Sequence, residues 1–325
     1  MKAVHLSRHG GLDVLDLWDV PVPQAGAGQV LVRVKMAGLN FADVCMREGD
    51  PFFPLPHIPG LEGAGIVEAV GPGVTGLKEG DRVAFVTWRL GAHADRVAVD
   101  ESAVIPLPDD ISFEQAASVI LQGLTAHYLV SEIHKIMPSD PVLVHAAAGG
   151  MGLLLVQWLK HVGAHVIGTV STDAKAKIAR DAGADHVIVY TREDFAEQTM
   201  KVTGGKGARY IIDGVGRSTF LKNLKAVALF GRICIYGRAS GKVENFDPLM
   251  LAPRSVSVTG GTMANYMRTP EETRGRAREV FDGMRRGWLK PRIDTKFPLE
   301  RIADAHRRLE SRASSGKIIL QIDAG

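Results

Sequence analysis

Apolar and polar residues alternate in short segments through the first third of the chain. Val30, Val32 and Val34 fall on one face of a predicted strand over residues 30–34, and Arg33 falls on the other. Further strands are predicted over 66–70 and 82–86, next to turn-forming Gly and Pro residues. Short strands joined in this way predict a compact β domain of the barrel or sandwich type.

The pattern changes near residue 112. Ser112, followed by Gln115 three residues later, fits a capping box and predicts the start of a helix. From Pro141 onward apolar strand-like runs alternate with helical segments, which indicates a parallel sheet covered by helices on both faces. The predicted strands are 142–146, 164–169, 187–190, 210–213, 232–236, 256–259 and 317–322, and the predicted helices are 152–162, 174–181, 271–286 and 299–310.

Composition and charge narrow the class of protein. The chain has 325 residues, 46% hydrophobic and 23% charged, which excludes a disordered protein and predicts a large core, in two domains. The 39 Lys and Arg residues against 36 Asp and Glu residues are spread along the chain, so no nucleic-acid partner is expected.

The two cysteines and the length of the apolar segments indicate the cellular compartment in which the protein is expected. Cys45 and Cys234 lie far apart in sequence, which favours a reducing compartment and excludes a four-cysteine metal lobe. Polar residues follow the first four residues, so no signal peptide is expected, and no stretch of about 18 apolar residues is present to span a bilayer. We therefore expect a cytoplasmic protein with no membrane association.

A glycine-rich turn follows the predicted strand 142–146. Ala147, Gly149 and Gly152 occupy the three positions of the G-x-G-x-x-G pattern, directly before a predicted helix. Glycines let the backbone approach a pyrophosphate, and the helix N-terminus supplies N–H groups and partial positive charge. A strand, turn, helix and second strand in this order favour dinucleotide binding over a plain structural turn.

The end of the next strand leaves the choice of dinucleotide open. NAD sites place an acidic residue there for the ribose 2′-hydroxyl, whereas NADP sites need a cation. Asp173 and Lys175 offer both signs beside Ser171 and Thr172. Asp173 is also interpreted as the cap of the following helix, and Lys175 as either a phosphate ligand or a solvated lysine.

The segment 139–152, with Gln157 and Lys160, resembles the quinone oxidoreductase (zeta-crystallin-like) group of the medium-chain dehydrogenase/reductase superfamily. The resemblance covers nearly the whole chain through the segments 38–43, 59–65, 80–83, 122–126, 213–216 and 309–312. It implies an α/β fold with a discontinuous GroES-like β-barrel catalytic domain over 1–122 and 263–325. The remaining residues, 123–262, would form a Rossmann-type dinucleotide-binding domain with a doubly wound parallel sheet. Two residues depart from the pattern of the group. Met151 stands where the group usually has a small branched residue, and Cys45 stands where several relatives have a tyrosine.

The resemblance also implies a site without metal. Zinc members of the superfamily carry a Cys, a His and a Cys at the positions of Asn40, Leu61 and Gln122. Leucine cannot bind a metal, and a catalytic zinc site needs three protein ligands. Among the histidines, His145 on a strand and His57 in a proline-rich loop are interpreted as structural or exposed.

The same resemblance implies that the protein would be a zinc-independent NADPH-dependent quinone oxidoreductase, with the cofactor expected between the two domains. Asn40 and Gln122 would be the catalytic pair beside the nicotinamide, although Asn40 also fits a capping residue. Two of the implied cofactor contacts also have a purely structural interpretation. Tyr190 could be a buried core tyrosine, and Arg312 could be an exposed arginine on a terminal helix. The implied cofactor-binding residues are Phe41, Cys45, Thr125, Gly149, Gly150, Met151, Ser171, Lys175, Tyr190, Val215, Gly237, Ser240 and Arg312.

No general acid stands out, because Asp43, Glu62 and Asp81 are interpreted as structural, so the proton would come from solvent. Two other functions stay open: reduction of α,β-unsaturated carbonyls or enoyl thioesters, and a non-catalytic structural or RNA-binding role. The apolar strand within 255–262 predicts pairing with a second copy in a homodimer.

Overall fold

The computed structural model describes residues 1–49 and 53–322. Its described residues group into two compact units. Unit 1 comprises Met1–Leu124, Met267–Asp282 and Pro291–Gly325, and unit 2 comprises Thr125–Tyr266 and Gly283–Lys290. The segment Gly283–Lys290 thus groups with unit 2, and the domain boundaries expected from the sequence stay a prediction.

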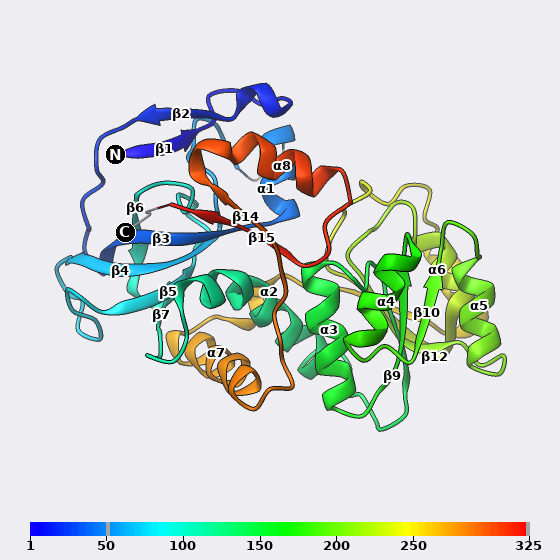
Figure 1. Ribbon diagram of the computed structural model, residues 1–325. Helices are drawn as coiled ribbons and strands as arrows, with labels where there is room; N and C mark the ends of the chain where they lie inside the picture. The colour runs from blue at the N-terminus through cyan, green and yellow to red at the C-terminus, as the bar shows by residue number, and fades with distance from the viewer. Residues whose placement is uncertain (50–52, 323–325) are drawn as a thin grey trace. The chain divides into compact units, whose positions relative to one another are not determined.

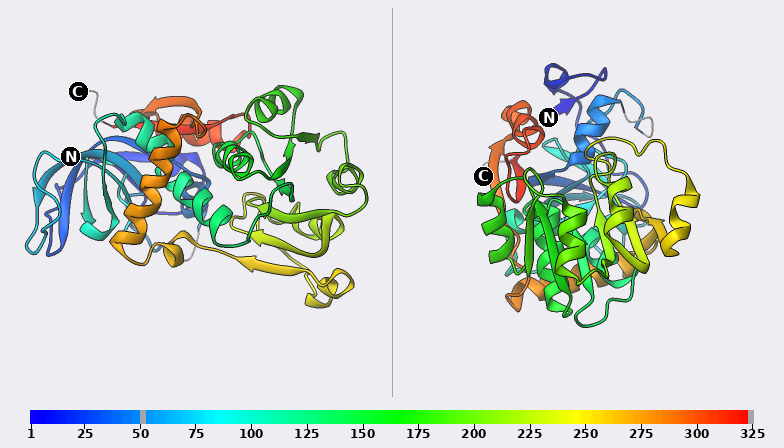
Figure 2. Two further views of the ribbon diagram at one scale, coloured as in Figure 1. Left: turned by 90° about the horizontal axis from the view of Figure 1, so that it is seen from below. Right: turned by 90° about the vertical axis from the view of Figure 1, so that its right-hand side faces the viewer.

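Unit 1 is built on a mainly antiparallel sheet with the strand order β14-β15-β3-β4-β5-β7, in which β6 also pairs with β3. The left view of Figure 2 shows β3 to β5, in blue and cyan, as strongly curved strands. A separate ribbon joins β1 and β2. The strands are β1 Lys2–His5, β2 Asp16–Asp19, β3 Gln29–Leu39, β4 Glu62–Val70, β5 Arg82–Val86, β6 Arg96–Asp100, β7 Val104–Pro106, β14 Ile293–Pro298 and β15 Lys317–Gln321.

The alternation in β3 explains how unit 1 forms its core. Val30, Val32 and Val34 are fully buried in one cluster with Phe85 of β5, whereas Arg33 is partly exposed. The helices of this unit are α1 Phe41–Glu48, α7 Pro270–Arg285, α8 Ile302–Glu310 and the first part of α2 Phe113–Ser131. Short 3-10 helices are η1 Leu12–Val14, η2 Glu101–Ala103 and η5 Leu299–Arg301.

Unit 2 contains a parallel sheet with the strand order β10-β9-β8-β11-β12-β13, which confirms the predicted Rossmann-type fold. Figure 1 shows α3 and α4 on one face of this sheet and α5 and α6 on the other. The elements are β8 Pro141–Val144, α3 Gly150–His161, β9 His165–Val170, α4 Asp173–Asp181, β10 His186–Val189, α5 Phe195–Val202, β11 Ala208–Asp213, α6 Phe220–Ala226, β12 Val227–Ile235, η3 Pro248–Arg254, β13 Ser257–Gly260 and η4 Met263–Tyr266.

The strand order of unit 2 reverses between β8 and β11. From β8 the chain moves outward to β9 and β10 on one side, and β11, β12 and β13 fill the other side. In open α/β sheets, ligands bind beyond the carboxyl ends of the strands at such a reversal. The sheet therefore directs attention to the turn that follows β8.

Two predicted helix starts have different outcomes. Ser112 N–H donates to Gln115 Oε1 at 2.9 Å and Gln115 N–H donates to Ser112 Oγ at 3.1 Å, which confirms the capping box. The interpretation of Asp173 as the cap of α4 is wrong, because Thr172 is the N-cap and its Oγ1 accepts from Lys175 N–H. None of the helices in the described part of the chain has the length and apolar composition needed to cross a bilayer.

Candidate active site

The turn after β8 leads directly into the N-terminus of α3 and contains residues with small or no side chains. Ala146 takes a left-handed conformation with φ of 52°, and its carbonyl accepts from Gly149 N–H at 2.9 Å. Gly149 is the N-cap of α3, which leaves the first N–H groups of that helix without partners inside the helix. Such a helix start favours an anion.

Two glycines allow this turn to pack tightly. A Cβ on Gly152 would lie 2.7 Å from Ala147 Cα and would also collide with the Ala146 carbonyl oxygen. A Cβ on Gly168 of β9 would lie 2.7 Å from Ala147 Cβ. Helix, turn and neighbouring strand therefore meet at a distance that only glycine permits, and the residues present fit a turn that holds a pyrophosphate.

Apart from Thr125 on α2, the cofactor residues expected in unit 2 follow neighbouring parallel strands, so they lie at the same edge of the sheet. This edge is the carboxyl edge, where the reversal of strand order also lies. The residues that follow β8, β9, β10, β11 and β12 in turn are Gly149, Gly150 and Met151; Ser171 and Lys175; Tyr190; Val215; and Gly237 and Ser240.

The segment after β9, where NAD and NADP sites of this fold differ, is linked by hydrogen bonds to the segment after β10. Both carboxylate oxygens of Asp173 accept from Arg192 at 2.6 Å, and this pairing lowers the pKa of Asp173. Thr191 Oγ1 donates to the Ser171 carbonyl at 3.0 Å. Tyr190 is 46% exposed, so the alternative of a buried core tyrosine is wrong. Arg192 is therefore a second cation in these segments, and no motif in the sequence marks it.

The loops after β11 and β12 are joined to each other. Ser240 Oγ donates to the Val215 carbonyl at 2.8 Å and accepts from Ser218 N–H at 3.0 Å. Asp213 Oδ1 accepts from the N–H groups of Val215 and Gly216 at 2.7 and 3.1 Å. Two expected cofactor residues, Val215 and Ser240, are thus held in one hydrogen-bonded arrangement.

A buried polar network lies behind these loops, and we call it the His145 network. His145 Nδ1 is 3.0 Å from Thr169 Oγ1, and its Nε2 is 2.8 Å from Asn223 Oδ1. Asn223 Nδ2 and Thr219 Oγ1 both donate to Asp213 Oδ2 at 2.7 Å. Burial lowers the pKa of His145 and so favours the neutral ring, which agrees with its interpretation as structural.

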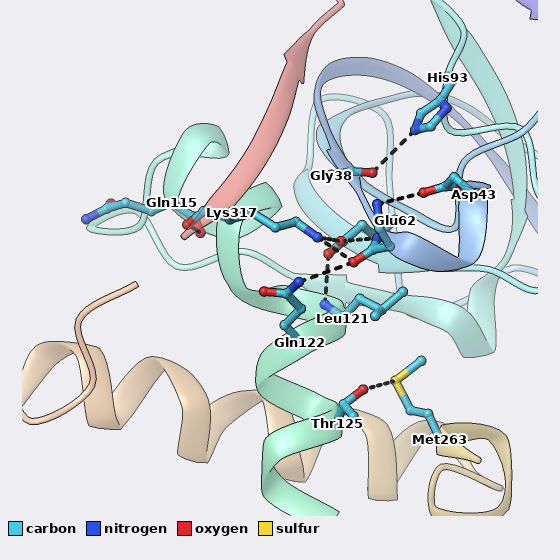
Figure 3. Close-up of polar contacts among 12 residues, drawn as sticks. Gly38, Asp43, Glu62, His93, Gln115, Leu121, Gln122, Thr125, Met263 and Lys317 are labelled. Atoms are coloured by element: carbon cyan, nitrogen blue, oxygen red, sulfur yellow. Dashed lines mark hydrogen bonds and ion pairs between the residues drawn. The ribbon is translucent and has the colours of Figure 1, made fainter. Parts of the chain in front are cut away.

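Unit 1 holds a second buried group of polar side chains, the Lys317 cluster, shown in Figure 3. Lys317 Nζ lies 2.5 Å from Glu62 Oε1 and 2.6 Å from Asn40 Oδ1. Asn40 Nδ2 donates to Glu62 Oε1 at 2.8 Å, and Gln122 Nε2 is 3.5 Å from Asn40 Oδ1. The structure therefore brings together the two residues expected to be catalytic, Asn40 and Gln122.

Local structure fixes Asn40 in this cluster. Asn40 follows β3 as the N-cap of α1, and its N–H donates to Asp43 Oδ2 at 2.8 Å. A Cβ on Gly38 would collide with the Glu62 carboxylate, so this glycine provides room for the acid. Burial raises the pKa of Asp43, against the opposing effects of His93, the Asn40 N–H and Lys317.

The Lys317 cluster has unsatisfied polar atoms. Within residues 1–49 and 53–322, Gln122 Oε1, Asp43 Oδ1 and His93 Nδ1 are buried with no hydrogen-bond partner. Buried polar atoms are nearly always paired, so each of these atoms calls for a ligand or an ordered water. The unpaired oxygen on Gln122 is an acceptor within the expected catalytic pair.

The remaining expected cofactor residues lie on helices or just after one. Phe41 and Cys45 are on α1 and partly buried, and Thr125 on α2 is 9% exposed, with its Oγ1 3.8 Å from Met263 Sδ. Arg312 follows α8, has a φ of 55° and is exposed at the surface, so its alternative interpretation as an exposed arginine stays open.

Known proteins match this chain over nearly its whole length. The family described as "Alcohol dehydrogenase GroES-like domain" matches residues 26–141, and "Zinc-binding dehydrogenase" matches residues 150–280. A protein from Pseudomonas aeruginosa named quinone oxidoreductase is 39% identical over 323 residues, which cover 98% of this chain and 99% of that protein. The chain belongs to the quinone oxidoreductase group of the medium-chain dehydrogenase/reductase superfamily. The resemblance drawn from the sequence is confirmed.

Two further proteins similar to this chain have names that state a substrate or a cofactor. A 2-haloacrylate reductase from Burkholderia is 37% identical over 332 residues, with 98% of each chain covered. The crystal structure of Escherichia coli quinone oxidoreductase complexed with NADPH has a TM-score of 0.96 and 37% identity, covering 99% of this chain and 100% of that chain.

One of the family descriptions names zinc, but the side chains of this chain at the positions of the zinc ligands do not suit a zinc ion. Leu61 is 1% exposed and packs against Met46 and Leu90, so it supplies hydrocarbon where zinc members supply a ligand. Across residues 1–49 and 53–322, no three or more His, Cys, Asp or Glu side chains are grouped to hold a metal ion. The expectation of a site without metal continues to rest on the chemistry of Asn40, Leu61 and Gln122.

Proposed function

We propose that the protein is an NADPH-dependent quinone oxidoreductase that works without a metal ion. The observation that carries the proposal is that two uncharged amides, Asn40 and Gln122, lie together at the positions of zinc ligands in related dehydrogenases. When bound, NADPH supplies a hydride, and a quinone that takes up this hydride and one proton from solvent becomes the hydroquinone. Asn40 and Gln122 would hydrogen-bond the acceptor, and the hydrophobic Leu61 would help to exclude water.

The residues at the carboxyl edge of unit 2 would hold the cofactor. The N–H groups of Gly150 and Met151 at the start of α3 suit the pyrophosphate, and Gly149, whose own N–H closes the turn on the Ala146 carbonyl, lets the backbone approach it. Ser171, Lys175 and Tyr190 suit the 2′-phosphate and the adenosine. The pairing of Asp173 with Arg192 supports NADPH over NADH, because both oxygens of the acid already accept hydrogen bonds. The further proposed cofactor contacts are Phe41, Cys45, Thr125, Val215, Gly237, Ser240 and Arg312.

A comparison of acceptors tests this function. NADPH consumption is measured with benzoquinone, with cyclohexenone and with an enoyl-CoA at matched concentrations. We expect the quinone to give the highest kcat/KM. Turnover of the enone or enoyl thioester alone would replace the proposal by the second candidate, which the similarity to 2-haloacrylate reductase favours. Salt-sensitive RNA binding in a filter assay, with no turnover of any acceptor, would favour a non-catalytic role.

Calorimetry with a matched pair of lysine variants tests the cofactor assignment. Lys175→Ala should raise the Kd for NADPH about tenfold or more and leave the Kd for NADH nearly unchanged, because only NADPH carries the 2′-phosphate. Lys177→Ala is the control, since Lys177 lies on the same helix and pairs with Asp181 at the surface. Equal losses for both cofactors in Lys175→Ala would contradict the assignment.

We also propose a cytoplasmic homodimer. The parallel sheet of unit 2 ends at β13, the strand expected to pair with a second copy. Large apolar side chains near it are exposed, including Phe230 at 64% and Leu249 at 75%. Cys45 and Cys234 form no disulfide with each other, which suits a reducing compartment. Light scattering that gives the mass of one chain would remove the dimer.

A further inference from the structure

Sheet register places a lysine directly against the proposed catalytic amide. Ile318 of β15 pairs with Leu39 of β3, so the same antiparallel register sets Lys317 opposite Asn40. In the neighbouring pair of strands Ala37 of β3 faces Gly63 of β4, which sets Glu62 next to the same end of β3. The meeting of these three side chains thus follows from the pairing of β15, β3 and β4.

The three side chains form a closed triangle of hydrogen bonds. Lys317 Nζ contacts Asn40 Oδ1 at 2.6 Å and Glu62 Oε1 at 2.5 Å, and Asn40 Nδ2 closes the triangle to Glu62 Oε1 at 2.8 Å. The second oxygen of Glu62 accepts from Leu121 N–H at 2.9 Å. Figure 3 shows Lys317 extending toward Glu62. The side chains of Lys317 and Glu62 are 2% and 0% exposed.

This triangle permits only one orientation of the Asn40 amide. An ammonium group can only donate hydrogen bonds and a carboxylate can only accept them. A flipped amide would place its NH2 group against Lys317 and its oxygen against Glu62, which makes two repulsive contacts. A cation on the amide oxygen also polarises the amide, so its N–H groups become stronger donors.

We propose that Lys317, held by Glu62, orients and polarises the Asn40 amide for the acceptor oxygen. Lys317 is a positioning residue because it is almost completely buried and acts through Asn40. The orientation of the amide is a property of the protein without any ligand. Its effect on turnover rests on the proposed quinone reductase function.

The amide can be observed directly by NMR in the protein without cofactor. The chain has four asparagines, at 40, 223, 245 and 265, so ¹⁵N-asparagine labelling gives four side-chain NH2 signals. Asn40→Ala assigns the Asn40 signal by its loss. We expect Lys317→Met to shift the Asn40 signal and leave the other three in place. Lys296→Met is the matched control, because Lys296 forms an exposed pair with Glu114 at 2.8 Å, and it should move none of the four.

Two more variants keep the test decisive if Lys317→Met does not fold. Lys317→Met/Glu62→Gln removes both buried charges together and should still shift the Asn40 signal. Lys317→Arg keeps a cation and should leave the signal closer to its wild-type position. An unchanged Asn40 signal in a folded variant that lacks the lysine would overturn the proposal.

Kinetics give the second readout. In Lys317→Met/Glu62→Gln, kcat with benzoquinone should fall about tenfold or more, because a charge-assisted hydrogen bond to the amide is lost, while the Kd for NADPH stays unchanged. Lys317→Arg should recover most of the kcat. A double variant with wild-type kcat would contradict the proposal. If the wild-type protein itself reduces no quinone, the proposed function fails, and the NMR result decides the orientation separately.

Discussion

The His145 network of unit 2 and the Lys317 cluster of unit 1 are both buried and polar, and they are organised differently. In the His145 network of unit 2, His145, Asn223, Asp213, Thr169 and Thr219 are joined in an unbroken series of hydrogen bonds of 2.7 to 3.0 Å. The Lys317 cluster of unit 1 contains a buried ion pair and, among the described residues, neighbouring buried atoms of Gln122, Asp43 and His93 without partners.

We interpret this difference as that between a scaffold and a site. A buried polar atom without a partner costs about 1–3 kcal/mol, so a fold tends to keep such atoms only where something else binds them. The hydrogen bonds of the His145 network hold the start of the turn after β8 and the loop after β11. The Lys317 cluster retains capacity beside Asn40 and Gln122, as a site for a substrate requires.

The largest effect on stability should come from breaking the buried ion pair. Lys317→Met should lower the free energy of unfolding by about 3–5 kcal/mol, because Glu62 is left charged and buried. Removing the exposed partner in Lys296→Met should cost about 0–1 kcal/mol. Urea denaturation measures both. Equal losses in the two variants would show that the cluster is not held by the buried pair.

Removing the His145 side chain from the His145 network should reduce the stability of the protein without reducing its turnover. His145→Ala leaves Thr169 Oγ1 and Asn223 Oδ1 without their ring partner, at a cost of about 1–3 kcal/mol. At saturating NADPH we expect kcat to match that of the wild type. A large loss of kcat in a folded His145→Ala protein would place chemistry in the network that we interpret as scaffold.

The smallest effect is a pH dependence. Burial lowers the pKa of His145 in the folded protein, and the opposing effects of Asp213 and Asn223 are smaller. In the unfolded chain the pKa of a histidine is about 6.5. Below that pH the unfolded state binds the proton more readily, so the network loses stability as the pH falls. Asp43, with its raised pKa, contributes with the opposite sign.

Melting curves can isolate the contribution of His145. Between pH 7.5 and pH 5, both set around the unfolded value of about 6.5, the wild type should lose more stability than His145→Asn. Parallel losses in the two proteins would show that the histidine does not carry this pH dependence.

Features set by neighbouring residues in sequence were predictable. The glycine-rich turn, the capping box at Ser112 and the strand Arg82–Val86 each depend on a few adjacent residues. The cap of α4 was misassigned by one residue, because Thr172 and Asp173 both fit the cap and only the backbone decides between them. Local patterns therefore located the turn after β8, at the edge of unit 2 where we propose that the cofactor binds.

The centre of the Lys317 cluster depends on tertiary pairing and was not predictable in the same way. Lys317 and Glu62 are 255 positions apart, and Glu62 was interpreted only as shaping the β domain. The one signal in the sequence was a lysine at the start of the apolar run Ile318–Leu320. Strand β14, which pairs with β15 in parallel, also escaped prediction, because its alternation is weak.

A matched pair of amide deletions tests most directly the claim that one network is a site and the other a scaffold. The measurement is the kcat for benzoquinone at saturating NADPH in Asn40→Ala and Asn223→Ala. We predict a loss of about 100-fold in Asn40→Ala, as for removal of a positioned hydrogen-bond donor, and a kcat near that of the wild type in Asn223→Ala. Equal losses in the two variants, or a loss in Asn223→Ala alone, would contradict the claim.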